Sequence, residues 1–501
     1  MQGMMRPAIV GIAIVFAVAA TAALADERKQ LAFDVVERNA QQMTDISDSL
    51  FYFGELGMQE IESTKLLKDT LSAAGFKVEL GGAGMPTNLW AEYGSGRPKI
   101  AIVTEVDALP GGSQTPGTYE RKPLVKDGPG HMEGHNTHGG VASLAAFAVK
   151  QVMQRTNLPG TVAISFGPAE EQIASRPFLV RAGYFKDVDA IIYLHIGEGL
   201  TTGYGVQNYA AISSIFTFHG KTAHGAVNPW DGKDAVDAVE LMDIGFDKLR
   251  EHLRPTYRAH RTITAGGIQP NIIPDKGQIW WFVRDASMPA AKETYDKLVK
   301  IAEGAALMTG TTWDVQYAAS AWPQLASKTI AEAVQKNIDM VGMPKWTEQE
   351  QSFARDFQKF AEKPVMGLRT AVTARRPRAV DVVERQRRRV LGGAGGTVEF
   401  SLVGAGCPVP RVEGGGDAGE LDLTQGAGHG RKSAGGLDHR SPDHAGARRQ
   451  GTGRVRNGIE EDAVFLAAAA RGAAAGRIEP RRDGEVPRRD ARLLPQQAAA
   501  V

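Results

Sequence analysis

Residues 99–110 read Lys-Ile-Ala-Ile-Val-Thr-Glu-Val-Asp-Ala-Leu-Pro. Their apolar first half is typical of a strand that is buried on both faces of a sheet, and acidic residues follow it at once. Comparable apolar runs lie at residues 161–166 and 189–195, and a segment with helical periodicity lies before them at residues 139–153. Because strands that alternate with helices form parallel sheets, the sequence predicts an α/β domain with a mostly parallel sheet.

The pattern changes near residue 206. Alternating and helical patterns then follow in the order strand, helix, strand, strand, helix, strand, at residues 210–219, 234–253, 262–269, 277–284, 289–308 and 312–317. This βαββαβ order is typical of a small antiparallel sheet backed by two helices. We therefore expect residues 206–320 to form an inserted α+β domain, and residues 26–205 and 321–368 to form the two parts of the α/β domain.

The composition changes again near residue 369. Residues 369–501 contain 22 arginines but a single lysine, Lys432, and two aromatic residues, Phe400 and Phe465. Runs of glycine and alanine replace the periodic apolar patterns. A disordered basic tail has this composition, but the abrupt replacement of lysine by arginine favours a GC-rich gene that is read in the wrong frame. We therefore expect the second part of the α/β domain to be incomplete at residue 368.

The first 25 residues have the features of a secretory signal peptide. Arg6 precedes an apolar run at residues 9–20, which is short for a membrane span, and small residues follow at positions 23 and 25. We expect residues 1–25 to be removed during export to the periplasm or the cell exterior, so that the mature chain begins at Asp26. The alternative is an uncleaved membrane anchor.

Charge and cysteine content exclude several classes of site. The formal net charge of +1 gives no reason to expect binding to nucleic acid or to a membrane surface. The single cysteine, Cys407, excludes a disulfide within the chain and a zinc site built from several cysteines. A metal site in this chain must therefore use histidine, aspartate and glutamate side chains.

Three polar segments each follow a predicted strand, where α/β proteins place their sites. They lie at residues 105–110, 131–138 and 168–171, and His195 stands at the end of the next strand. Taken singly, such residues are ordinary surface or loop positions. Together they supply what a hydrolytic metal site needs, namely several nitrogen and oxygen ligands for each ion and a carboxylate to accept a proton from water.

These segments resemble the amidohydrolase branch of the zinc aminoacylase and carboxypeptidase family. The corresponding family motifs are Glu-x-Asp-Ala-Leu-Pro, Cys-Gly-His-Asn, Pro-Gly/Ala-Glu-Glu, Gly-x-x-Ala-His-Ala and Gly-Gly-Ile-x-Pro-Asn, at residues 105–110, 133–136, 168–171, 220–225 and 266–271. The resemblance extends from about residue 30 to residue 368. It implies a hydrolase with two divalent metal ions, zinc or manganese, and an inserted domain that serves as a lid and dimerisation domain.

The resemblance also implies roles for the metal-binding segments. Glu170 would be the general base and Glu171 a metal ligand. His135 and His195 would be further ligands. Glu133 stands where the family often has a cysteine that bridges the metals, and a bridging carboxylate would favour manganese, or zinc bound by harder ligands.

Three residues of the inserted domain are implied to act on the substrate. His224 would reach an active site, either that of its own chain or that of a partner protomer, and polarise the scissile carbonyl. Asn271 and Arg284 would contact the substrate carboxylate, which the planar fork of an arginine can pair with two hydrogen bonds.

The other histidines are weaker candidates for metal ligands. His131 and His138 flank the bridging position and could substitute as ligands, although we expect them to support the ligands instead. The family takes a last histidine ligand from near its C-terminus, and nothing after residue 369 resembles that segment. We assign this role to none of His429, His439 and His444.

The expected reaction is hydrolysis of an N-acyl or N-aroyl amino acid, or of a dipeptide-like amide, by a homodimer joined through the inserted domain. Two alternatives remain. One is an inactive, frame-disrupted copy of such an enzyme, and the other is a periplasmic solute-binding protein, which also has two α/β lobes. The paired glutamates favour an enzyme, because binding alone needs no water-activating base. Metal content separates the enzyme from the solute-binding protein.

Overall fold

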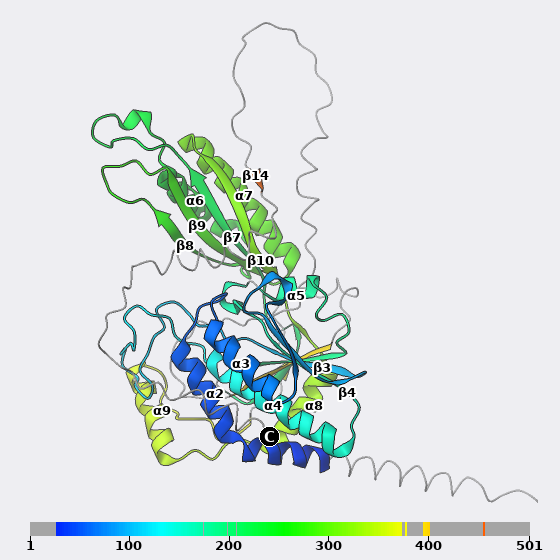
Figure 1. Ribbon diagram of the computed structural model, residues 1–501. Helices are drawn as coiled ribbons and strands as arrows, with labels where there is room; N and C mark the ends of the chain where they lie inside the picture. The colour runs from blue at the N-terminus through cyan, green and yellow to red at the C-terminus, as the bar shows by residue number, and fades with distance from the viewer. Residues whose placement is uncertain are drawn as a thin grey trace, which may run out of the picture.

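The chain forms a larger and a smaller domain, one above the other in Figure 1. The computed structural model describes residues 27–372 except 174, 198 and 207, and beyond them the strands at residues 376–377, 394–400 and 454–455. The signal-peptide prediction for residues 1–25 lies outside the described residues. Within the described part of the chain, every helix is too short or too polar to cross a membrane.

The larger domain is built on a mixed nine-stranded sheet. In spatial order the strands are β1 (Lys77–Leu80), β2 (Leu89–Ser95), β4 (Gly160–Phe166), β3 (Lys99–Thr104), β5 (Ala190–Ile196), β13 (Ala394–Phe400), β11 (Leu325–Ala326), β6 (Thr201–Val206) and β12 (Arg376–Pro377). β4, β3 and β5 are parallel neighbours, as the apolar runs predict. β1 and β2 add an antiparallel edge, of which the sequence patterns predicted neither β1 nor the antiparallel direction.

Both faces of the parallel centre are buried, which explains its continuous apolar runs. One face is covered by α2 (Ala40–Phe53), α3 (Ile61–Ala73) and α4 (His135–Thr156) (Figure 1). Ile102 of β3 packs against these helices. Its neighbours Ala101 and Val103 point to the opposite face and pack with Trp90 and Tyr193, because successive side chains of a strand alternate between faces.

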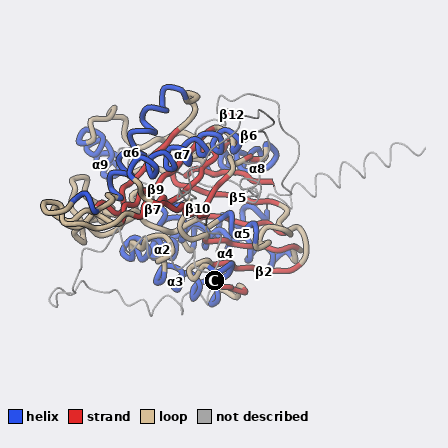
Figure 2. The backbone as a smooth tube through the Cα atoms, turned by 90° about the horizontal axis from the view of Figure 1, so that it is seen from above, coloured by secondary structure: helices blue, strands red, loops and turns tan. Residues whose placement is uncertain are grey.

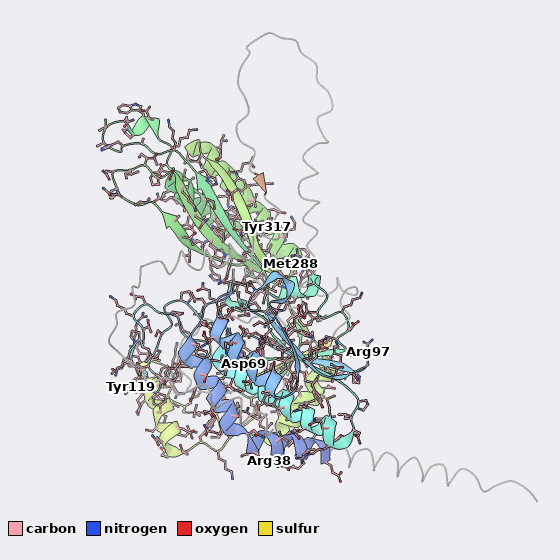
Figure 3. All side chains as sticks on the ribbon, in the orientation of Figure 1. Arg38, Asp69, Arg97, Tyr119, Met288 and Tyr317 are labelled. Carbon is pink, nitrogen blue, oxygen red and sulfur yellow. The ribbon has the colours of Figure 1, made fainter. Side chains whose placement is uncertain are left out.

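Three further helices complete the larger domain. They are α5 (Arg176–Arg181), α8 (Lys328–Val341) and α9 (Glu348–Phe360), preceded in the chain by a helix over residues 27–38. On α8, Ile338 packs with Leu200 beside β6. Tyr119, from the long loop after β3, contacts Phe353 and Phe360 of α9 at ring-centroid distances of 6.1 and 5.4 Å (Figure 3). α9 thus lies against the loop that carries the second polar segment.

The smaller domain has a second sheet with two helices on one face (Figures 1 and 2). Its elements, in chain order, are β7 (Ala210–His219), α6 (Ala235–Leu249), β8 (Arg258–Gly266), β9 (Lys276–Asp285), α7 (Met288–Thr309) and β10 (Thr312–Ala321). The strands lie in the order β10-β7-β9-β8, all antiparallel. Phe216, Phe218 and Trp281 of the sheet are fully buried against α6 and α7.

In the smaller domain, local side-chain and backbone interactions determine where helices and strands begin and end. α6 begins after Asp234, whose carboxylate accepts a hydrogen bond from Val236 N at 2.7 Å. The strand expected at residues 262–269 is observed at Arg258–Gly266. It ends earlier because Gly267 has a φ of 88°, a left-handed conformation that does not continue a strand.

Two adjacent connections join the domains. One runs from β6 to β7 and the other from β10 to β11, and they are tied by a hydrogen bond from Gln324 N to Asn208 Oδ1 at 2.6 Å. β6 and β11 pair directly beside them, with Val206 opposite Leu325. The smaller domain therefore leaves and re-enters the larger one at a single place.

Most of the segment at residues 369–501 lies outside the described residues, and so does the interpretation of it as frame-shifted or disordered. Three short strands of this segment are described. β13 pairs in parallel with β5 and antiparallel with β6, β12 pairs with β6, and β14 (Arg454–Val455) pairs with β10. Residues 394–400 thus form part of the sheet of the larger domain, beside β5.

Candidate metal centre

The parallel strands bring the polar segments together. β3, β4 and β5 end at the same edge of the sheet because they point the same way. Glu105 and Asp107 directly follow β3, the 3-10 turn Glu170–Gln172 follows β4, and His195 lies at the end of β5. His135 is the first residue of α4, which packs beneath this edge.

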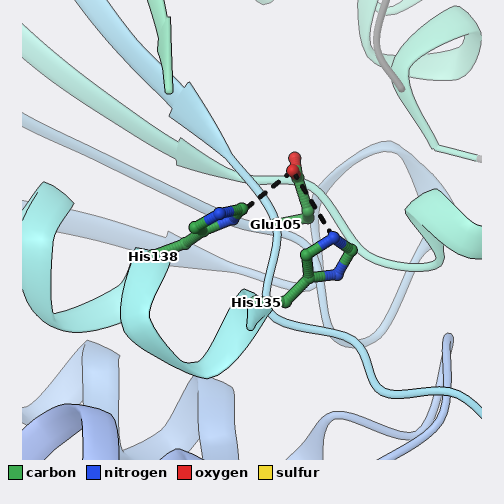
Figure 4. Close-up of side chains that lie close together, drawn as sticks. All are labelled: Glu105, His135 and His138. Carbon is green, nitrogen blue, oxygen red and sulfur yellow. Dashed lines mark ion pairs between the residues drawn. The ribbon is translucent and has the colours of Figure 1, made fainter. Parts of the chain in front are cut away.

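Three histidine rings lie against one another beside Glu105. His135 Nε2 is 3.3 Å from His195 Nε2, and the His138 ring centroid lies 5.1 and 4.9 Å from those of His135 and His195. Glu105 Oε1 is 3.4 Å from His138 Nδ1 and 3.9 Å from Nε2 of each of the other two rings. Figure 4 shows Glu105 between His135 and His138.

Backbone contacts determine which nitrogen each ring presents. His135 Nδ1 lies 3.0 Å from the carbonyl oxygen of Asp107, and His195 Nδ1 lies 2.8 Å from that of Ile196. A carbonyl oxygen only accepts, so both rings donate from Nδ1 and turn Nε2 toward each other, which is the usual arrangement of metal-binding histidines. His138 differs, because its Nε2 accepts a hydrogen bond from Ile196 N at 3.0 Å and its Nδ1 faces Glu105.

Glutamates complete three groups of closely spaced ligand atoms, with the atoms of each group within 4.8 Å of one another. One is the group of Glu105, His135 and His138. The other two, called the two ligand groups below, are Glu133 with His135 and His195, and His135 with Glu170 and Glu171. Among the described residues, Glu133 Oε1 and Glu170 Oε2 are buried side-chain atoms with no hydrogen-bond partner. Carboxylate and imidazole donors in these positions fit divalent zinc or manganese.

The electrostatics of the site also favour a bound cation. Burial, followed by repulsion from neighbouring carboxylates, raises the pKa of Glu170 to about 8 and that of Glu171 to about 9. Burial likewise raises the pKa of Glu133 to about 7. Burial alone would lower the pKa of His135, but Asp107 and other carboxylates raise it well above its usual value. A divalent cation would neutralise this concentration of negative charge.

Glu105 has no role in the sequence analysis, yet it lies at the centre of the buried network. Burial would raise its pKa, but the Arg176 guanidinium and His138 hold that pKa well below its usual range. Arg176 forms an ion pair with Glu105, and Tyr193 donates to Glu105 Oε1 at 2.8 Å. Arg176 lies on α5 within an ordinary apolar and basic pattern, so no local signal identifies it in the sequence.

The structure distributes the predicted substrate-binding residues between two places. Arg284 of β9 is largely buried, which lowers its pKa, while the nearby charges of Glu170, Glu171 and Glu133 act in the opposite direction. Arg284 therefore lies near the metal-binding glutamates. His224 and Asn271 lie together elsewhere on the smaller domain, where both are exposed and Gly225 N donates to Asn271 O at 2.9 Å.

His131 lies outside the two ligand groups. Its Nε2 contacts the carbonyl oxygen of Leu50 on α2 at 3.0 Å. Burial lowers its pKa to about 4, so this ring is neutral and oriented by the helix.

Known proteins resemble the chain in sequence. A sequence profile of peptidase family M20/M25/M40 matches residues 101–378. A p-aminobenzoyl-glutamate hydrolase component of Escherichia coli is 35% identical over 326 residues, which cover 65% of this chain and 68% of that protein. The N-acetylcysteine deacetylase of Bacillus subtilis is 30% identical over 263 residues, which cover 50% of this chain and 67% of the relative.

A solved structure has a related fold. It is an aminobenzoyl-glutamate utilization protein from Klebsiella pneumoniae, with 17% sequence identity and a TM-score of 0.50. The superposition covers 74% of this chain and 93% of that chain. At this level of identity, the similarity concerns the fold alone.

Proposed function

Because the chain belongs to peptidase family M20/M25/M40, we propose that it hydrolyses the amide bond of an N-acyl or N-aroyl amino acid, or of a small dipeptide-like amide. The observation that carries this proposal is the convergence of Glu133, His135, Glu170, Glu171 and His195 at one edge of the sheet. The names of the relatives support the substrate class, since one is a hydrolase of p-aminobenzoyl-glutamate and another deacetylates N-acetylcysteine.

Four residues would hold two divalent ions. His135 and His195 would bind through Nε2, Glu171 would bind beside His135, and Glu133 would bridge the two positions. Bound zinc or manganese would supply Lewis acidity, which makes water a better nucleophile at neutral pH and polarises the scissile carbonyl.

Glu170 would carry the proton transfers. Its carboxylate accepts a proton from the attacking water and later donates it to the amide nitrogen, so that the C–N bond breaks and a carboxylic acid and a free amine leave. A base for this task works best with a pKa near the operating pH, and burial raises the pKa of Glu170 toward that range. Its neighbour Glu171 stays oriented because its backbone N–H donates to Asp107 Oδ2 at 2.9 Å.

The substrate carboxylate would be bound from the smaller domain. Arg284 lies near the metal-binding glutamates and can pair with a carboxylate. His224 and Asn271 lie together on the exposed surface, and we propose that they serve the other protomer of a homodimer. Large apolar side chains are exposed on the same domain, at Val227, Trp230, Ile263, Ile268 and Ile272. We propose that they form an apolar patch, which is typical of an interface.

We expect the protein to be a dimer that dissociates when the patch is made polar. Trp230 is 77% exposed and Ile268 is 98% exposed, so the substitutions Trp230→Ser and Ile268→Ser remove apolar surface without opening the core. Size-exclusion chromatography with light scattering measures the mass of each form. A parent protein that is monomeric at all concentrations would rule out the homodimer.

We expect hydrolysis to require bound metal. Treatment with a chelator should abolish cleavage of p-aminobenzoyl-glutamate and of N-acetyl amino acids, and added zinc or manganese should restore it. His135→Ala should lower the number of ions bound per chain, because His135 belongs to both ligand groups. Metal analysis together with an amine-release assay checks both points. Full activity after complete metal removal would contradict the proposal.

The alternative of an inactive copy is favoured by the composition of residues 369–501, with its 22 arginines and one lysine. The same measurements separate it from the enzyme. An inactive copy would bind metal weakly and release no amine. Correcting the reading frame near codon 369 would then restore both properties.

A further inference from the structure

The turn that carries the two glutamates has an unusual backbone. Ala169 and Ile173, on either side of Glu170–Gln172, have φ angles of 55° and 59°. Residues other than glycine rarely adopt this left-handed conformation, and β-branched residues such as isoleucine hardly ever do. Such a conformation persists only where its surroundings fix it, so the contacts of this glutamate turn (residues 169–173) determine where Glu170 and Glu171 point.

One of these contacts is a buried carboxylate from a distant part of the chain. Glu60, directly before α3, has no exposed surface. Its Oε1 accepts a hydrogen bond from Ala169 N at 2.8 Å, and its Oε2 accepts one from Thr87 Oγ1 at 2.6 Å. The first bond holds the left-handed residue itself, and the second fixes the carboxylate that holds it.

The residues before Glu60 support the same turn and its neighbour. A Cβ on Gly57 would lie 2.7 Å from Ala169 Cα, so only glycine allows this close approach. Met58 packs with Ala169 in a small apolar cluster. The carbonyl oxygen of Glu55 accepts from Ala108 N at 2.7 Å, next to Asp107. The segment at residues 55–60 therefore contacts both the loop after β3 and the glutamate turn after β4.

We propose that Glu60 is a positioning residue, which sets the orientation of Glu170 and Glu171 by holding Ala169 N. This inference rests on the proposed function, in which Glu171 binds metal and Glu170 moves a proton. Glu60 itself touches neither the metal-binding atoms nor the substrate. Loss of its carboxylate would leave a buried N–H without a partner and free the glutamate turn to change conformation.

Loss of the Glu60 carboxylate should lower the affinity for metal. This affinity can be measured whether or not the chain turns over substrate. Supporting residues of metal sites typically change affinity or activity about 10–100-fold when they are replaced. We therefore expect Glu60→Ala to weaken Co²⁺ binding about 10–100-fold. Glu60→Gln should stay within about threefold of the parent, because the glutamine oxygen still accepts from Ala169 N and its amide can donate to the Thr87 hydroxyl.

Glu55→Ala is the matched control. The Glu55 carboxylate belongs to the same segment but accepts from Glu62 N and Ser63 N, both at 2.9 Å, at the start of α3. Its loss should lower the unfolding midpoint and leave Co²⁺ affinity unchanged. Co²⁺ affinity is measured on the full chain by competition with a chromophoric chelator, and urea unfolding is measured in parallel.

The outcomes separate this inference from the function on which it rests. If Glu171→Ala binds Co²⁺ like the parent, the proposed metal centre is wrong. If Glu171→Ala loses affinity while Glu60→Ala keeps it, or if Glu60→Gln is as weak as Glu60→Ala, the positioning role is wrong. Should Glu60→Ala fail to fold, Thr87→Val replaces it, because it removes only the bond that fixes the carboxylate. We expect about 3–10-fold weaker binding for Thr87→Val, less than the usual 10–100-fold for supporting residues because the carboxylate itself remains, and unchanged binding would overturn the role.

Discussion

Glu170→Gln should bind metal and substrate like the parent and lose most of its turnover, by about 10²–10⁴-fold. The glutamine has the same shape and buries the same area, but its amide cannot accept and return a proton. Glu170 is 5% exposed, and one of its oxygens is buried without a hydrogen-bond partner among the described residues. Its substitution therefore removes the proposed proton acceptor and breaks no hydrogen bond through that atom.

Substitution of the adjacent Glu171 should have a different effect from substitution of Glu170. Glu171→Ala should lose metal, because its carboxylate belongs to the same ligand group as His135. Metal content and steady-state rates, measured for both variants beside the parent, distinguish the two roles. Equal loss of metal in both variants would show that the roles of base and ligand are wrongly assigned.

Arg176→Met should destabilise the larger domain by about 3–5 kcal/mol, the usual cost of removing one partner of a buried ion pair. Glu105 has no exposed surface and faces Arg176 directly. The guanidinium also lies over the Tyr193 ring, with Cζ 5.4 Å from its centroid. Methionine fills similar space but leaves the carboxylate of Glu105 without its cation. Urea unfolding of the parent and the variant measures the free-energy difference.

Two further variants show whether the loss of unfolding free energy in Arg176→Met comes from the uncompensated charge of Glu105. Arg176→Met combined with Glu105→Gln removes both charges and should recover part of the lost stability. Arg97→Met removes an exposed partner of Asp189 and should change the unfolding free energy far less, since exposed ion pairs contribute little. If Arg176→Met and Arg97→Met cost the same, Arg176 does not stabilise Glu105 in the way described.

Local patterns predicted the parallel strands at the centre of the fold, and the family resemblance named most of the residues that lie together in the candidate metal centre. β3, β4 and β5 are short apolar runs, and the acidic and histidine segments directly follow or precede elements with clear periodicity. The family resemblance rests on the same segments and is confirmed by the profile match and by the identity to the Escherichia coli hydrolase. Glu133, His135, Glu170, Glu171 and His195 could therefore be named from the sequence.

The residues that orient this site could not be predicted, because their partners are distant in the chain. Arg176 is 71 residues from Glu105, Tyr193 is 88 residues from Glu105, and Glu60 is 109 residues from Ala169. No periodicity or motif marks such a pair, since each becomes adjacent only when the sheet has formed. The antiparallel edge of β1 and β2 was missed for a similar reason, because strand direction depends on the whole topology.

The paired connections tied by Asn208 and Gln324 have a mechanical consequence. A rotation about these connections would use them as a hinge and the smaller domain as a lever arm that extends along β7. Arg284 pairs with Ala211 near the hinge, whereas Lys276 pairs with His219 at the far end of the same strand. Ten residues of strand span about 33 Å, so a rotation of about 10° would move the far end by about 6 Å at that length. The same rotation would leave Arg284 nearly stationary. The arginine would therefore stay near the metal centre while the far end of the smaller domain moves by the larger distance.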